Sequence, residues 1–194
     1  MHRSAIFVLS GLLALLITGC NHRGAAVADS TTQPADAGDG KVFHDKKYHF
    51  SFVYPDNWTS RKGDDPEDVL TIDADKDKPQ QAEITVSIPK LPPHIPGMLP
   101  LPAVEKGYID DVKKRMQNVK EPLSEPLKID GASARRFVIT GNDKNGKRKL
   151  IVLAIFKGDH LFVITAEGAE DQFSTMKPAF DQIARSWKWA EQPK

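Results

Sequence analysis

The feature that most constrains the fold is the run "LIVLAIF" at residues 150–156. In an extended chain, Leu150, Val152 and Ala154 point to one face, and the apolar residues between them point to the other. The run "LFVIT" at 161–165 has the same two-sided character. Strands that are apolar on both faces belong in the interior of a sheet that is covered on both sides. The chain must therefore supply a layer above this sheet and a layer below it.

Turn signals organise the second half of the chain into an antiparallel meander. Dipeptides that favour two-residue hairpin turns occur at three places: Asp130-Gly131, Asn145-Gly146 and Gly158-Asp159. They separate four apolar runs that we expect to be strands: 123–129, 132–140, 150–156 and 161–166. Two earlier segments, "YHFSFVY" and "AEITVSI", alternate with the period of half-buried strands.

Two amphipathic segments are available to cover the sheet. Within 102–118, which has a proline suited to a helix start, one face carries Val104, Tyr108, Val112 and Met116. Within 170–187, one face carries Phe173, Met176, Phe180, Ile183, Ala184 and Trp187. Pro178 predicts that the main part of the second helix begins near Lys177. We therefore expect an α+β domain in which an antiparallel meander sheet is covered by helices on both faces, an α/β/α sandwich.

Two motifs near the ends of this domain carry a family resemblance. A Phe-rich strand runs into Tyr-Pro-x-x-Trp in "YHFSFVYPDNW", and a "DG-x-x-A" turn, two apolar strands and a helix ending "IARSWKW" follow later. The arrangement resembles the PsbP/Mog/DcrB-like domains over most of residues 43–189. The resemblance implies a PsbP-like fold and a role in binding or assembly, because members of this superfamily share no common active site. It supplies no catalytic residue.

The N-terminal residues have the pattern of a lipoprotein signal. An apolar run over 5–18 is shorter than the roughly 20 residues of a transmembrane helix and fits the core of a secretory signal. It ends in Ile17-Thr18-Gly19-Cys20, which resembles the bacterial lipobox. The resemblance implies cleavage before Cys20 and its modification with diacylglycerol and a fatty acyl chain such as palmitate. The alternatives are an uncleaved anchor and a plain signal peptide with an incidental cysteine.

The chain is expected to have three parts: a signal peptide at 1–19, the lipidated cysteine and a flexible tether at 20–40, and the PsbP-like domain at 41–190. Residues 21–40 contain no aromatic residue and one branched apolar side chain, so they cannot offset their ordering entropy by burial. We expect a lipid-anchored protein of the cell envelope, with the bilayer as a partner through Cys20. Asn21 favours the outer membrane if the cell is Gram-negative.

Charge and motif content argue against several kinds of site. The chain has 27 Lys and Arg against 26 Asp and Glu, so it lacks the basic surplus typical of nucleic-acid binding. Asp73, Asp75 and Asp77 have the spacing of a calcium loop, but the sixth position is Lys78 and the twelfth is Ile84. The histidines match no zinc motif. We expect no nucleic-acid partner, no metal and no cofactor.

Two segments are candidate binding surfaces. The proline-rich stretch "PKLPPHIPGMLPLP" is either a rigid crossover or a partner-binding loop, with these candidate contact residues: His94, Ile95, Met98 and Leu99. The hairpin "KNGKRK" either keeps a turn soluble or contacts anionic lipid, with these candidate residues: Lys144, Lys147, Arg148 and Lys149.

No nucleophile motif points to an enzyme, and Cys20 is expected to carry lipid. We expect a non-catalytic binding domain that binds a protein partner and assists assembly or maintenance of a membrane-associated complex. Two alternatives stay open: a carrier or receptor for a small apolar ligand, and a hydrolase whose site is assembled in space.

Overall fold

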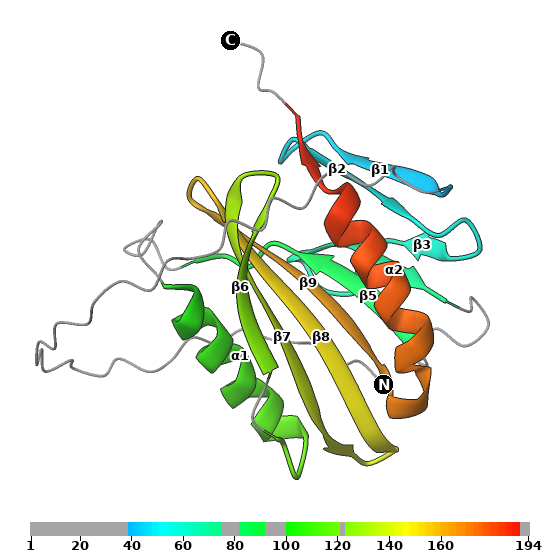
Figure 1. Ribbon diagram of the computed structural model, residues 1–194, viewed down its shortest axis with the longest axis vertical. Coiled ribbons are helices and arrows are strands. Elements are labelled where there is room, and N and C mark those ends of the chain that lie inside the picture. The colour runs from blue at the N-terminus through cyan, green and yellow to red at the C-terminus, as the bar shows by residue number, and fades with distance from the viewer. Residues whose placement is uncertain (1–38, 75–81, 92–99, 121–122, 191–194) are drawn as a thin grey trace, which may run out of the picture.

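The structure is a computed structural model that describes residues 39–74, 82–91, 100–120 and 123–190. Within these residues it has a large and a small antiparallel sheet and two α-helices (Figure 1). The large sheet has the strand order β3-β4-β5-β9-β8-β7-β6. Its strands are β3 (Thr59–Arg61), β4 (Asp68–Asp73), β5 (Ala82–Ser87), β6 (Leu123–Ile129), β7 (Ala132–Asp143), β8 (Gly146–Lys157) and β9 (His160–Ala169).

The remaining elements lie on the two faces of the large sheet. The small sheet has the order β1-β2-β10, with β1 (Lys41–Asp45), β2 (Phe50–Tyr54) and β10 (Lys188–Trp189). The helices are α1 (Leu101–Arg115) and α2 (Phe173–Ser186), and a 3₁₀ turn, η1 (Glu170–Gln172), precedes α2. The predicted meander is confirmed, because β6, β7, β8 and β9 pair antiparallel in chain order.

The two apolar faces of β8 divide the core into two clusters, as its sequence predicts. Leu150, Val152 and Ala154 pack with the buried face of α1, and Ile151 and its odd-numbered neighbours pack with α2. The buried face of α1 includes the predicted residues Val104, Tyr108 and Val112, and the predicted Met116 joins the same cluster directly after the helix ends. The buried residues of α2 are Met176, Ala179, Phe180 and Ile183.

The small sheet corrects the expected architecture. The predicted strand in "YHFSFVY" does not join the meander but pairs with β1 on one side and β10 on the other. Phe50 and Phe52 on β2 face the same core cluster as α2, and Phe50 stacks on Trp187 at 4.4 Å between ring centroids. The face on the α2 side is therefore covered by a helix together with a small sheet, and helices alone do not cover it.

The structure differs from two local predictions, the start of the second helix and the position of the second hairpin turn. The helix predicted to begin near Lys177 begins at Phe173 and contains Pro178. The proline lies within the first two turns, so it costs one intrahelical hydrogen bond without ending the helix. The second hairpin turns at Lys144 and Asn145, one residue earlier than predicted, because Gly146 already pairs with Asp143. Gly146 takes the positive φ of 116° that the end of this turn requires.

Candidate functional site

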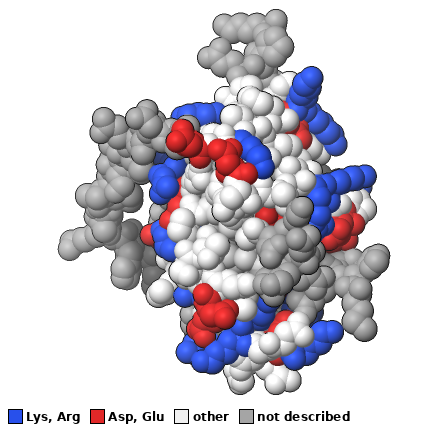
Figure 2. Space-filling view, turned by 90° about the vertical axis from the view of Figure 1, so that its right-hand side faces the viewer, with Lys and Arg blue, Asp and Glu red and all other residues white. Residues whose placement is uncertain are grey.

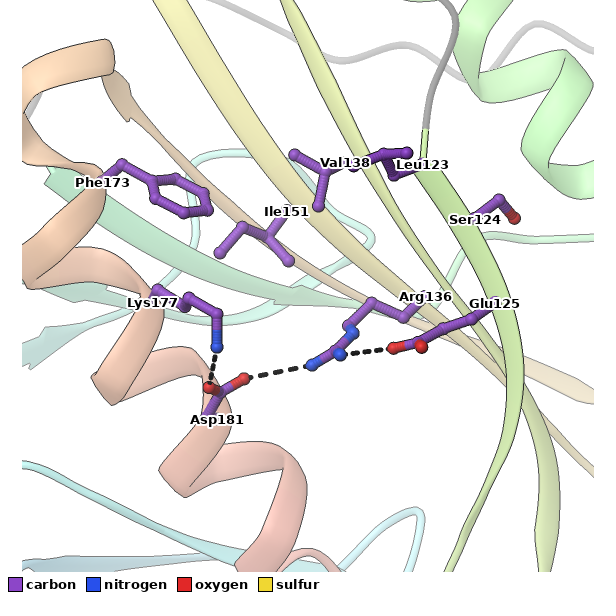
Figure 3. A pocket seen from close by; sticks show the side chains of 9 residues that line it. All are labelled: Leu123, Ser124, Glu125, Arg136, Val138, Ile151, Phe173, Lys177 and Asp181. Atoms are coloured by element: carbon purple, nitrogen blue, oxygen red, sulfur yellow. Dashed lines mark hydrogen bonds and ion pairs between the residues drawn. The ribbon is translucent and has the colours of Figure 1, made fainter. Parts of the chain in front are cut away.

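A groove lies between α2 and the free edge of the large sheet. Helix α2 packs over β2, β9 and β5, so the sheet extends beyond the helix at β7 and β6. The resulting groove has a volume of about 310 Å³. It is lined by Leu123, Ser124, Glu125, Arg136, Val138, Ile151, Phe173, Lys177 and Asp181 (Figure 3).

One side of the groove is apolar. Leu123, Val138 and Ile151 occupy paired positions on three neighbouring strands, so their side chains form a row across the sheet. Phe173, the first residue of α2, continues this row on the helix side (Figure 3). Leu123 is 83% exposed, and it is one of two large apolar side chains exposed among the described residues. This row offers an apolar contact surface at the sheet edge.

The other side of the groove is a chain of ion pairs. Arg136 contacts Glu125, its partner in strand register, and its Nη1 lies 3.3 Å from Oδ1 of Asp181 on α2. Lys177 Nζ lies 2.5 Å from Oδ2 of the same aspartate. Two basic and two acidic groups thus neutralise one another (Figure 3). The groove consequently suits an apolar side chain flanked by polar backbone better than a free charged ligand.

A second arrangement of charges lies on the opposite face of the sheet. Asp73, Glu83 and Glu167 are paired in register across β4, β5 and β9, and we call this row the acidic ladder. Like charges that face each other on neighbouring strands destabilise a sheet. Arginines offset the repulsion at both ends of the ladder. Arg61 Nε lies 2.9 Å from Asp73 Oδ2, and Arg115 Nη1 lies 3.1 Å from Glu167 Oε2.

Glu83, the middle carboxylate of the ladder, has a strongly raised pKa. Burial, with repulsion from Glu167 and Asp73, raises the pKa of Glu83 to about 7. Burial also raises the pKa of Asp73, whose Oδ1 atom is buried without a hydrogen-bond partner among the described residues. Glu83 can therefore hold or release a proton near neutral pH. No three His, Cys, Asp or Glu side chains in the described part of the chain are placed to hold a metal ion.

Most of the predicted site residues lie outside the part of the chain that the structure describes. These are the predicted lipidation site and the proline-rich loop residues: Cys20, His94, Ile95, Met98 and Leu99. Three aspartates have the spacing of a calcium loop, although the sequence does not predict a calcium site. Of these, Asp73 lies on β4, whereas Asp75 and Asp77 are outside the described residues. At the ends of the proline-rich stretch, Leu91 and Leu101 pack against the α1-side cluster.

The predicted basic cluster is not one exposed patch. Lys144 and Lys147 are exposed at the β7–β8 hairpin, and Lys147 Nζ lies 3.6 Å from Glu170 Oε2. Arg148 is buried, with Nη2 3.4 Å from Glu167 Oε1. Lys149 lies over the ring of Phe173, at 3.6 Å from its centroid. Lipid contact through this hairpin stays a prediction only for the two exposed lysines.

The groove was not predicted from the sequence, although its residues carry a weak signal. Leu123 and Val138 fall in strands that the sequence predicts, and Phe173 falls in a predicted helix face. The alternation of β6 puts Leu123 on the core face of a strand whose other residues are mostly exposed. An apolar residue at the outer end of a largely polar edge strand is the feature that marks the site.

Neither described helix has the length and apolar character needed to span a membrane. The family model for PsbP-like proteins matches residues 17–189. None of the curated proteins compared with this chain matches it.

Two solved structures resemble this fold. CyanoP, the cyanobacterial PsbP of Synechocystis sp. PCC 6803, superposes with a TM-score of 0.59 at 19% identity, over 82% of this chain and 98% of that one. LpqN of Mycobacterium tuberculosis, described as involved in cell envelope biogenesis, superposes with a TM-score of 0.52 at 14% identity, over 79% of this chain and 87% of that one. At these identities the similarity concerns the fold.

Proposed function

The chain belongs to the PsbP-like protein family, and on this premise we propose that it is a membrane-anchored protein of the cell envelope whose domain binds a partner without catalysing a reaction. The family assignment agrees with the resemblance expected from the Tyr-Pro-x-x-Trp motif. The anchor is supported by the lipobox-like sequence that ends at Cys20. The envelope role is supported by the fold's occurrence in LpqN, which is described as involved in cell envelope biogenesis. In this proposal the domain assists assembly or maintenance of a membrane-associated complex.

The groove beside α2 is the observation that carries the binding role. Its apolar row ends in the exposed side chain of Leu123, and its charged row is neutralised within the protein. A partner that inserts an apolar side chain between Leu123 and Phe173 removes apolar area from water without leaving a charge unpaired. A protein segment meets this requirement, because its backbone can contact the polar groups along the rim.

The contribution of Leu123 to the affinity for a partner can be estimated from its exposure. Full burial of a leucine side chain contributes about 1.5–3 kcal/mol. Because the free protein leaves 83% of Leu123 exposed, a partner has most of this burial to gain. An anchor residue of this kind therefore contributes roughly tenfold to hundredfold in affinity.

Photo-crosslinking in cells tests the proposal. A photoreactive amino acid replaces Leu123 in one strain and Val42 in another, because Val42 on β1 is the second exposed large apolar residue in the described part of the chain, at 57% exposure. We expect a discrete covalent adduct with another protein from position 123 and none from position 42. Adducts of equal yield from both positions, or from neither, would contradict binding through the groove.

A small apolar ligand is the second candidate occupant of the groove. A volume of about 310 Å³ with an apolar row lies at the lower end of the roughly 300–1,000 Å³ typical of ligand pockets. Native mass spectrometry of the purified full chain detects such a ligand by its added mass. If the groove holds it, Val138→Phe, which fills the groove between Leu123 and Ile151, should remove the added mass while the protein stays folded. A mass that is unchanged by this substitution would place the ligand elsewhere.

A further inference from the structure

One end of the molecule carries a cluster of lysine and aromatic side chains that we call the lysine–aromatic tip. It consists of three turns with their flanking residues and the last strand, which lie uppermost in Figure 1: residues 45–49, 128–131, 157–160 and 188–189. Pairing of β10 with β2 connects two of these segments. The backbone N–H of Trp189 donates to Oδ2 of Asp130 at 2.9 Å, which connects a third.

The aromatic side chains of the tip have one edge in the core and one at the surface. The ring of Trp189 is half-buried and lies 4.9 Å from the centroid of the buried Phe162. Tyr48, also half-buried, meets Phe162 edge-on at 6.1 Å and His160 at 5.3 Å. Tryptophan and tyrosine with this division between apolar and polar surroundings are typical of the interface between a bilayer and water.

Exposed lysines surround these rings. Lys47 Nζ lies 4.6 Å from the centroid of Tyr48, and Lys157 Nζ lies 5.6 Å from that of Trp189. The exposed lysines of the tip are Lys46, Lys47, Lys128, Lys157 and Lys188. Lys and Arg side chains are visible at the upper end of the molecule in Figure 2.

The acidic residues of the tip are fewer, and each has a local partner. Asp45 accepts hydrogen bonds from two backbone N–H groups of the turn that follows it. Asp130 lies 3.3 Å from Nζ of Lys188 and accepts a backbone N–H from β10. Asp159 Oδ1 lies 2.6 Å from Nδ1 of His160. The tip therefore has five lysines against three aspartates, whereas the whole chain is close to neutral.

We infer that the lysine–aromatic tip is a docking surface for an anionic bilayer. The lysines supply charge complementary to acidic headgroups, which attract basic residues within a Debye length of about 8 Å in physiological salt. Tyr48 and Trp189 supply rings suited to the headgroup region, and the long lysine stems can extend around them. The basic β7–β8 hairpin fits this role less well, because Arg148 is buried.

The course of the chain agrees with this orientation. β1 runs from Lys41 to Asp45 directly into the first turn of the tip. A strand of this length spans roughly 16 Å, so the point where the chain enters the domain is close to the docking surface. A protein anchored through Cys20 can therefore place the tip on the membrane that holds it. The inference goes beyond the proposed function, since the groove lies on a different part of the domain.

Tryptophan fluorescence tests the inference on the full chain reconstituted into vesicles. The chain has three tryptophans, of which Trp58 and Trp187 are buried and Trp189 is half-exposed. The vesicles contain phosphatidylcholine brominated near the headgroup, either alone or with about 30 mol% phosphatidylglycerol. The phosphatidylglycerol gives the membrane the negative surface potential that attracts basic residues. The fluorescence of Trp189 is obtained as the difference in tryptophan fluorescence between the native chain and Trp189→Phe. We expect this fluorescence to be quenched in the anionic vesicles and not in the neutral ones.

Matched lysine variants locate the docking surface. Each basic residue near an anionic surface contributes about fivefold (about 1 kcal/mol), so Lys47→Gln with Lys157→Gln should lower the ratio of docked to undocked domain by roughly 30-fold. Lys144→Gln with Lys147→Gln makes the same charge change at the β7–β8 hairpin and should leave the ratio within about twofold.

Three results would overturn the inference, provided that circular dichroism shows each variant to be folded. The first is equal quenching in neutral and anionic vesicles. The second is an equal loss of quenching in both lysine variants, which would indicate net charge without a specific surface. The third is no quenching of Trp189 in either vesicle; capture of a protein through a crosslinker at Lys47 would then identify the tip as a protein-binding surface.

Discussion

The acidic ladder gives a prediction whose sign and size follow from the structure. Glu83 faces Asp73 on one neighbouring strand and Glu167 on the other, and burial together with these charges raises its pKa from 4.5 to about 7. The folded state therefore favours the protonated form of Glu83 more than the unfolded state does. The resulting stabilisation is fully present below about pH 4.5 and is lost as the pH rises through about 7.

Replacement of Glu83 by Gln removes the contribution of Glu83 to the pH dependence of the free energy of unfolding. A pKa that rises from 4.5 to about 7 corresponds to about 3 kcal/mol between the two protonation states. Because 30% of the Glu83 side chain is exposed, solvent screening reduces the expected effect to about 1–2 kcal/mol. Glu83→Gln should therefore raise the free energy of unfolding by about 1–2 kcal/mol at pH 8 and change it little at pH 4.5.

Urea unfolding followed by tryptophan fluorescence measures the difference at both pH values. Asp56→Asn is the control, because Asp56 is an exposed carboxylate in the turn after β2, and its change should stay below about 0.5 kcal/mol at either pH. A change for Glu83→Gln that is the same at pH 4.5 and pH 8 would refute the reasoning. Destabilisation that grows with pH would refute it as well.

Three further substitutions have expected outcomes. Glu105 on α1 is buried and contacts Arg135 and Ser124, so Glu105→Ala should lower the free energy of unfolding in urea by about 2–3 kcal/mol, whereas a loss below 0.5 kcal/mol would show that the contacts contribute nothing. Phe180→Ala removes a fully buried ring from α2 and should cost about 3–5 kcal/mol in the same assay; a protein of unchanged stability would contradict the described core. Cys20→Ser should abolish fatty-acid labelling in cells and release the protein from membranes, and persistent labelling would contradict the expected lipid anchor.

The meander was predictable because its signals are local. Turn dipeptides such as Asp130-Gly131 and the two-sided apolar run of β8 are read within a dozen residues, and the structure places strands at each of the four predicted runs. Asp130 and Gly131 both take positive φ, as the predicted two-residue turn requires. The small sheet was missed because it pairs strands from opposite ends of the domain's sequence, as in the pairing of Trp189 with Phe50. β3 and β4 were missed because short, partly polar strands have little periodicity.

The surfaces were less predictable than the core, because each is assembled from distant segments. Leu123 and Phe173 line one groove only because α2 leaves the sheet edge uncovered. The acidic ladder depends on the register of three strands, of which one was not predicted. The lysines of the tip are dispersed along the sequence, whereas the one dense basic run, at the β7–β8 hairpin, includes a residue that the fold buries, Arg148. Spacing along the chain therefore predicted the hairpin as a basic surface and gave no signal for the lysines of the tip.

The most direct test of the central proposal is the affinity of groove variants for the protein captured by crosslinking at position 123. Leu123→Asp and Val42→Asp introduce the same charge at the two exposed apolar residues of the described chain, one inside the groove and one outside it. Binding through the groove predicts that Leu123→Asp weakens affinity by at least tenfold, while Val42→Asp changes it by less than about threefold. Equal affinities for the two variants would contradict the proposal that this domain binds its partner through the groove beside α2.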